Sequence, residues 1–384
     1  MAGYPKDWKV EKIGNLVAIE TGNKNTQDRE DGGIFPFYVR SDKVERINCY
    51  THDTEGVVTA GDGVGTGKIF HYAKGKFALH QRCYLMHQFD ASLDSNYFYW
   101  FFKTYFYDRI ALMTAKSSVD SVRREMIADM PIAYPASIEE QKRIAKALAS
   151  IDNLIENLTR RIEKKRLVKH GVMQELLTGK KRLPGFTGKW KQVLLKEVGV
   201  FQKGHGINRS ETHSGSIPAV RYGEIYTHHN DYVRKYNSFI SEKVAANAVA
   251  VHRGDVIFAG SGETAEEIGK AVAIVDNGVY VGGDTIIFSP HDPDAPIFWG
   301  YLLNMPYVQH QKTLSAHGAT IIHIRPEAIA TLHICIPEPP EQSAIATVLA
   351  NMDASIANLE SKRSKYEVIK RGLMHDLLTG KVRV

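Results

Sequence analysis

The chain has 384 residues, 43% of them hydrophobic and 24% charged, and a formal net charge of +6. These values are ordinary for a globular protein and exclude a disordered tail protein, a collagen-like fibre or a pure coiled coil. No run reaches the roughly 18 apolar residues that a membrane span requires, and the first residues lack the apolar core of a signal peptide. We therefore expect a cytoplasmic protein of two or three domains.

Metal and disulfide chemistry have little support in the sequence. The three cysteines, Cys49, Cys83 and Cys335, lie far apart and form no Cys-x-x-Cys pair. The 16 histidines include no convincing helical His-x-x-x-His pair with a carboxylate partner. We expect neither a disulfide framework nor a bound metal.

Residues 1–136 predict a first globular domain of mixed α/β type. Short β-branched and aromatic stretches alternate with glycine and aspartate turns, which favours strands joined by tight connections. An aromatic stretch over 97–107 predicts a helix, and an apolar stretch over 130–135 predicts a closing strand. The glycine-rich run at 61–68 lacks the Gly-x-x-x-x-Gly-Lys-Ser/Thr spacing of a phosphate loop, so we interpret it as a turn.

Residues 137–182 predict a long helix that acts as a first spacer. Ser137 and Glu140 have the spacing of a capping box, and Gly179 suits the left-handed residue that often follows a helix. Apolar residues recur at alternating four- and three-residue steps, which is typical of a coiled-coil seam. The seam residues of this spacer are Ile144, Leu148, Ile151, Ile155, Leu158 and Ile162.

The second half of the chain repeats this order, which indicates an internal duplication. Residues 183–337 predict a second mixed α/β domain with an aromatic helix over 298–309, and residues 338–384 predict a second helical spacer. The segments 140–183 and 341–384 align without a gap at an offset of 201, and 20 of the 44 pairs are identical. The second seam comprises Ile345, Leu349, Met352, Ile356, Leu359, Leu373 and Leu377.

Two similar seams in one chain require a covering surface. We expect the two helices to pack against each other, because that arrangement covers both seams at once. The alternative is that each helix packs on its neighbouring globular domain. Basic residues of segment 160–169 lie on the polar face, where they are either solvated or available to a partner subunit or a phosphate backbone.

Two motifs return in both spacers and carry a resemblance to a known family. One is a Glu-Gln pair at 140–141 and 341–342, which follows a closing strand and proline. The other is Leu-Leu-Thr-Gly-Lys at 176–180 and 377–381. Together with the tryptophan that opens each domain, these motifs resemble the specificity (S) subunit of type I restriction–modification systems, and the resemblance spans the whole chain.

The resemblance implies an α/β (α+β) fold in which two target recognition domains are separated by two long antiparallel coiled-coil helices, with a pseudo-twofold internal repeat. Each domain would read one half of a bipartite target in double-stranded DNA. The helices would fix the spacing and dock two modification subunits, which bind S-adenosylmethionine. Up to two restriction subunits would add ATP- and Mg-dependent cleavage. This chain would itself bind no cofactor and catalyse no reaction.

Base readout requires donors and acceptors on loops that reach a groove, so we select polar residues of expected loops, each with a structural role as the alternative. In the first domain these are Lys24, Asn25, Arg40, Lys68, Arg82, Lys116 and Ser118. In the second domain they are Asn208, Arg209, Arg221, Tyr222, Ser261, His317 and Thr320. Both domains are slightly acidic, so phosphate contacts must come from local clusters or from partner subunits.

Two other functions compete with DNA recognition. A self-contained DNA methyltransferase or nuclease would need catalytic motifs, but the sequence contains no Asn/Asp-Pro-Pro-Tyr/Phe motif. The glycine turn at 258–262 also lacks the apolar helix that follows a cofactor-binding Rossmann turn. The third possibility is a scaffold that binds no DNA. Two similar modules without catalytic motifs favour recognition.

Overall fold

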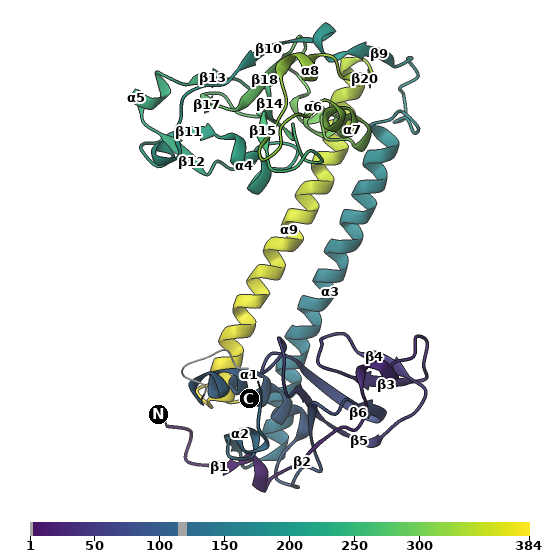
Figure 1. The fold of residues 1–384 in the computed structure, drawn as a ribbon. Coiled ribbons are helices and arrows are strands. Elements are labelled where there is room, and N and C mark those ends of the chain that lie inside the picture. The colour runs from purple at the N-terminus through teal and green to yellow at the C-terminus, as the bar shows by residue number, and fades with distance from the viewer. Residues whose placement is uncertain (1–2, 114–120) are drawn as a thin grey trace. The chain divides into compact units, whose positions relative to one another are not determined.

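The chain forms two compact units, each with one mixed α/β domain and parts of both long helices (Figure 1). The structure is a computed structural model that describes residues 3–113 and 121–384. The first unit comprises Met1–Arg160 with Glu360–Val384, and the second unit comprises Arg161–Leu359. The mixed α/β fold class predicted from the sequence is confirmed.

A six-stranded sheet forms the centre of the first domain. Its strand order is β2-β7-β5-β6-β3-β4, and neighbours are antiparallel except β3 and β6. In β5, Val57, Val58 and Thr59 are fully buried, and such a β-branched run fits the middle of a sheet. The strands are β2 (Ala18–Thr21), β3 (Phe35–Tyr38), β4 (Glu45–Ile47), β5 (His52–Ala60), β6 (Phe70–Leu79) and β7 (Cys83–His87).

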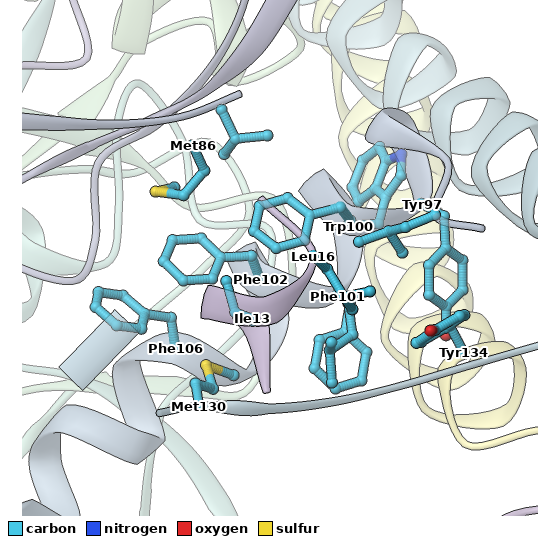
Figure 2. Close-up of a cluster of buried hydrophobic side chains, with 14 of the residues drawn as sticks. Ile13, Leu16, Met86, Tyr97, Trp100, Phe101, Phe102, Phe106, Met130 and Tyr134 are labelled. Atoms are coloured by element: carbon cyan, nitrogen blue, oxygen red, sulfur yellow. The ribbon is translucent and has the colours of Figure 1, made fainter. Parts of the chain in front are cut away.

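Helix α1 (Ser95–Met113) packs against β5 and β6 and is longer at both ends than the sequence predicts. Its aromatic side chains fill a buried cluster with Ile13 and Met86 (Figure 2). Strand β1 (Trp8–Lys12) pairs antiparallel with β8 (Pro131–Pro135), so the domain closes where it begins. The remaining short elements are η1 (Ile13–Asn15), η2 (Thr26–Asp28) and α2 (Arg124–Ala128).

Two four-stranded sheets replace the single large sheet in the second domain. Their orders are β10-β18-β14-β16 and β12-β11-β17-β13, and the parallel pair β11 and β17 matches β3 and β6. Their strands are β10 (Gly199–Lys203), β11 (Ile217–Val220), β12 (Ser238–Ile240), β13 (Val249–Val251), β14 (Val256–Ala259), β16 (Ala271–Ala273), β17 (Val279–Val281) and β18 (Thr285–Pro290). Two further pairs are β9 (Lys191–Leu194) with β20 (His333–Ile336) and β15 (Ser261–Gly262) with β19 (Ile322–His323).

The aromatic helix of the first domain is divided in the second. Helix α6 (Pro296–Leu303) ends before Asn304, and α7 (Pro306–Leu314) begins at Pro306. Proline lacks a backbone N–H and suits the first position of a helix, not its interior. The single helix predicted over 298–309 is therefore wrong. Shorter helices are η3 (Leu195–Glu197), η4 (Arg209–Glu211), α4 (Tyr222–Thr227), α5 (Glu242–Ala245) and α8 (Pro326–Ala330).

The two long helices are α3 (Ile138–Leu176) and α9 (Pro339–Leu378). The backbone N–H of Glu140 donates to Ser137 Oγ at 3.4 Å, as the capping pattern predicts. Beyond the helix ends, Gly179 and Gly380 have φ values of +69° and +72°, a conformation that glycine adopts without strain.

The seam residues pack both on the opposite helix and on the neighbouring domain. In the first unit, Ile144 and Leu148 of α3 share a buried cluster with Leu377 of α9 and with the aromatic residues of α1. In the second unit, Ile345 and Leu349 of α9 share a cluster with the end of α3 and with α6. Packing on the opposite helix and packing on the neighbouring domain are alternatives in the sequence analysis, whereas the structure shows both. The seam positions that are only half-buried are Ile155, Met352, Leu359 and Leu373.

Among the described residues, no helix has the length and apolar character needed to cross a membrane. Within residues 3–113 and 121–384 there is also no group of three or more His, Cys, Asp or Glu residues that could hold a metal ion. The cytoplasmic location and the lack of a cofactor stay predictions.

Candidate DNA-reading loops and helical interface

Two charged pairs join the long helices in the first unit. Arg383, just beyond α9, donates from Nη2 to the Glu140 carboxylate of α3 at 2.7 Å, and Lys370 of α9 pairs with Asp152 of α3. Arg383 also donates to Asp7, and this hydrogen bond holds the pKa of the Asp7 carboxyl below its usual value. An acid near the start of one helix thus meets a base near the end of the other, so the helices are antiparallel here.

The second unit contains the same two pairs at positions shifted by 201 residues. Arg182, beyond α3, donates from Nη2 to the Glu341 carboxylate of α9 at 2.6 Å. Lys169 of α3 donates from Nζ to Asp353 of α9 at 2.7 Å. The Glu341 side chain is only 3% exposed, so its guanidinium partner compensates a buried charge.

The pairs are exchanged between the two copies of the repeat. In these four pairs, the two acids of the first copy meet bases of the second copy, and the two acids of the second copy meet bases of the first. A reciprocal pattern of this kind is the property of an interface with twofold symmetry. The duplication in the sequence is therefore accompanied by a pseudo-twofold pattern in the contacts between the two copies.

Asp353 has additional partners that join the second domain to the helices. It accepts a hydrogen bond from the Tyr301 hydroxyl of α6 and forms an ion pair with Arg234 at 2.6 Å. Burial raises the pKa of Tyr301, and its hydrogen bond to Asp353 raises that pKa further, so the phenol stays protonated. The lysines of the two units have similar surroundings: Lys169 Nζ lies 4.7 Å from the centroid of the Tyr301 ring, and Lys370 Nζ lies 5.2 Å from that of the Trp100 ring.

The structure brings Lys24, Asn25 and Arg82 of the first domain together. The backbone N–H of Gln81, in the turn between β6 and β7, donates to the Lys24 carbonyl at 2.8 Å. Its side-chain amide donates to Asn25 Oδ1 at 2.5 Å. Arg82 is the next residue of the same turn, so the turn joins the loop of Lys24 and Asn25 to Arg82.

Asp62 adds Arg40 to this group. Its two carboxylate oxygens accept from Arg40 Nη1 at 2.5 Å and from Arg82 Nη1 at 2.7 Å. The Gly61 N–H also donates to the Arg82 carbonyl at 2.8 Å, which fixes the two loops to each other. We call Arg40, Asp62 and Arg82 the arginine clamp. Asp62 was missed in the sequence analysis because no motif marks it.

The glycine-rich run continues from the clamp to Lys68. Gly63 and Gly67 have φ values of +80° and +68°, so this loop requires glycine at both positions. Val64, between them, is fully exposed, and Lys68 Nζ lies 5.3 Å from the centroid of the Tyr107 ring. The run is thus a turn, as the sequence indicates. The selected Lys116 and Ser118 lie outside the described residues.

The second domain gathers Ser261 and His317 around a residue that was not selected, His323. Ser261 Oγ lies 2.9 Å from His323 Nδ1. The backbones of His317 and His323 exchange hydrogen bonds of 3.1 and 2.8 Å. Thr320 is exposed in the loop between them. This turn occupies the place of the arginine clamp, because Asp62 bridges to Ser121 as Ser261 pairs with His323.

Tyr222 lines a pocket of about 410 Å³ beside this turn. Tyr226, Glu263, Glu267 and Ile321 are among the other lining residues. The Tyr226 hydroxyl donates to the Ser261 carbonyl at 3.1 Å, and burial raises the pKa of Tyr226, so it stays a donor. The pocket lining is therefore partly aromatic and acidic, whereas the corresponding loops of the first domain carry Arg40, Lys68 and Arg82.

The other selected residues of the second domain lie at the starts of short helices. The backbone N–H of Asn208 donates to Glu211 Oε2 at 2.7 Å at the start of η4, where Arg209 follows. The backbone N–H of Arg221 donates to Glu224 Oε2 at 3.3 Å at the start of α4. Their backbones thus have a local structural role, and their side chains stay predictions as DNA contacts.

The chain thus contains two mixed α/β domains, each followed by a long helix. The profile of the family "Type I restriction modification DNA specificity domain" matches residues 5–165 and 187–369. The chain therefore belongs to this family and contains its domain twice. Its function is that of the DNA-recognition subunit in type I restriction–modification, as the resemblance implies.

Several curated proteins are similar to this chain. The MjaVIII specificity subunit of Methanocaldococcus jannaschii is 25% identical over 99% of this chain and 94% of its own length. The EcoDI specificity subunit of Escherichia coli is 28% identical over 41% of this chain and 34% of its own length.

Solved structures share the fold. The S subunit of the type I system from M. genitalium matches with a TM-score of 0.70 at 15% identity, covering 98% of this chain and 97% of that one. A chain from a structural study of complex assembly and conformational transition of the type I R-M system matches with a TM-score of 0.56 at 14% identity, over 100% of both chains. At these identities the likeness concerns the fold alone.

Proposed function

We propose that the chain is a non-catalytic specificity subunit and that each domain reads one half of a bipartite DNA target. The observation that carries this proposal is the exchange of ion pairs between the repeats, because it makes the two domains equivalent partners of one pseudo-twofold scaffold. A protein with twofold symmetry reads two half-sites at a separation that its scaffold sets. The lengths of α3 and α9 would then determine the number of unread base pairs.

The same helices would dock two modification subunits, one on each copy of the repeat. Leu167 and Val168 of α3 are 74% and 50% exposed, and Val368 and Ile369 of α9 are 58% and 38% exposed. The two pairs are separated by the repeat offset of 201 residues, so they form equivalent apolar surfaces. Exposed aliphatic residues at repeated positions support a repeated partner.

Catalysis would belong to those partners. The modification subunits would bind S-adenosylmethionine and methylate adenine, and restriction subunits, where present, would use ATP and Mg. This chain would select the DNA sequence at which they act, through the loops around the arginine clamp and around the Ser261–His323 pair.

Domain exchange tests the proposal directly. Residues 1–136 would be replaced by the corresponding domain of another specificity subunit, and methyladenine would be mapped in a genome that carries the chimera and its modification subunits. We expect only one half of the methylated sequence to change while the spacing stays constant. Changes in both halves, or in neither, would refute the assignment of one half-site to each domain.

The self-contained methyltransferase is tested with the purified chain alone. Labelled S-adenosylmethionine and target DNA would be incubated with the chain, with and without modification subunits. We expect methyl transfer only in the complex. Transfer by the chain alone would contradict a non-catalytic role.

A further inference from the structure

The arginine clamp combines three side chains that are brought together from three connections of one sheet. Arg40 follows β3, Asp62 follows β5, and Arg82 lies in the turn between β6 and β7. The Asp62 side chain is only 20% exposed, whereas those of Arg40 and Arg82 are 37% and 59% exposed. The carboxylate is thus the inner group, and the two guanidinium groups face outward.

The carboxylate of Asp62 is held in its charged form. Burial alone would raise the pKa of Asp62, but the hydrogen bonds from Arg40 and Arg82 outweigh this effect and lower it. Among the described residues, each guanidinium contacts Asp62 only through Nη1. An arginine has five N–H donors in a planar fork, so each side chain keeps the Nε–Nη2 edge for another acceptor pair.

Backbone contacts hold this arrangement. The Arg82 N–H donates to His80 Nδ1 at 3.0 Å, and the Arg82 carbonyl accepts from Gly61. The sequence-independent attraction of an arginine to phosphates acts through charge and needs no fixed plane, whereas a bidentate contact, to a phosphate or to a base edge, uses the planar fork. The Asp62 carboxylate restricts the orientation of both guanidinium planes, because it bonds to Arg40 and to Arg82. A fixed guanidinium plane matters where one arginine must donate to two acceptor atoms at the same time.

We propose that the arginine clamp reads guanine in the half-site of the first domain. Guanine presents N7 and O6 in the major groove, two acceptors that match one arginine fork. Because both Nη1 atoms bond to one carboxyl group, they lie no further apart than about two base-pair steps of 3.4 Å. The clamp therefore addresses two G·C pairs that lie within three consecutive base pairs, with Asp62 as the positioning residue. This inference rests on the proposed function and adds the base that the first domain selects.

The second domain has no equivalent clamp among its described residues. Ser261 occupies the position of Asp62 and pairs with His323, and Glu263 and Glu267 lie beside it. Guanine preference through paired arginines is therefore expected in one half-site only.

The test uses the assembled complex with its modification subunits and a DNA library in which each half-site position is varied. Wild type is compared with Arg40→Gln, Arg82→Gln and Asp62→Ala. We expect each arginine variant to lose preference at one G·C pair by about 5- to 150-fold, the value of one bidentate contact. Asp62→Ala is expected to weaken preference at both pairs. The half-site of the second domain should be unaffected in all three.

Two further variants separate base reading from charge and from folding. Arg82→Lys keeps the charge without the fork, so we expect it to retain affinity for non-specific DNA but to lose the guanine preference. Arg29→Gln removes an exposed arginine that also lies near an aspartate, Asp31 at 3.6 Å, and serves as the matched control.

Two results would overturn the inference. One is a first half-site without G·C pairs. The other is a loss of affinity that is equal at every position and reduces the salt dependence of binding, which would make the arginines phosphate contacts. A wild-type complex without any sequence preference would instead refute the proposed function, so the two failures are distinguishable.

Discussion

Lys312 of α7 is a fully buried lysine in the second domain. Its Nζ donates to the Gly269 carbonyl at 2.7 Å and to the Leu303 carbonyl at 3.0 Å, and it lies 5.8 Å from the centroid of the Phe258 ring. Burial lowers the pKa of Lys312 to about 7, because the charged form loses its hydration. The side chain joins α6, α7 and the loop before β16 at one point.

This pKa makes the stability of the second domain depend on pH. An unfolded lysine has a pKa of about 10.4, so between pH 7 and pH 10 the unfolded chain binds more protons than the native chain. Stability contributed by this residue therefore rises with pH across that window, and below pH 7 the cost of the buried charge is fully present. We expect Lys312→Met to flatten the rise in urea midpoint between pH 7 and pH 9.

Lys243→Met, an exposed lysine on α5, is the matched control for this measurement. It should keep the wild-type pH dependence. An equal rise in the Lys312→Met variant and in the control would show that Lys312 does not cause it.

Single residues of this kind are the least predictable part of the sequence. Lys312 stands between Gln311 and Thr313, which resembles an exposed helix surface. Arg40 and Arg82 lie in loops, as expected, and their selection as DNA contacts stays a prediction; their shared partner Asp62 is 22 and 20 residues away in the sequence. Only the sheet order brings the three together, and that order depends on tertiary packing.

At the scale of elements, the spacing of apolar residues predicted the two long helices, and short apolar stretches predicted the closing strands. The 3.5-residue period of apolar residues led to α3 and α9, because a buried face must recur at the helical repeat. The division of α6 from α7 was missed, although Pro306 is visible in the sequence, since the aromatic residues on both sides suggested one element. The β9–β20 and β1–β8 pairs join residues more than 100 positions apart, and local patterns do not encode such pairing.

The apolar pairs on the helices give a prediction at this scale. We expect Leu167→Asp with Val168→Asp to remove one modification subunit from the complex, because a charged residue placed in an apolar interface loses its hydration. Val368→Asp with Ile369→Asp should remove the other. The mass of the assembled complex, measured by native mass spectrometry, reports the number of subunits.

Asn358→Asp places a charge at another exposed position of α9 and should leave the complex complete. If both double variants also assemble fully, the modification subunits do not dock on these surfaces.

At the scale of the whole molecule, the first unit depends on the last residues of the chain. Leu377 and Leu378 belong to the buried cluster of the first domain, and Arg383 pairs with Glu140 and Asp7. The offset of 201 residues revealed the duplication. It did not reveal that the end of each long helix completes the buried cluster at the start of the other. The sequence also did not show that one six-stranded sheet corresponds to two four-stranded sheets.

Deletion of residues 360–384 tests this dependence. We expect the first domain to become sensitive to limited proteolysis, because its cluster loses two buried leucines and Glu140 loses its partner. The second unit, which needs only residues 161–359, should keep its protection. Mass spectrometry of the fragments locates the first cleavages, and initial cuts in the second unit would contradict the division into units.

The exchanged pairs also impose an order on synthesis. As the polypeptide leaves the ribosome, the first domain emerges early but lacks the residues that complete its cluster. The second unit can close once residue 359 is free, whereas the first must wait for residues 360–384. The domain that is translated first is therefore the one that finishes folding last, and a prematurely terminated chain would carry it unfinished.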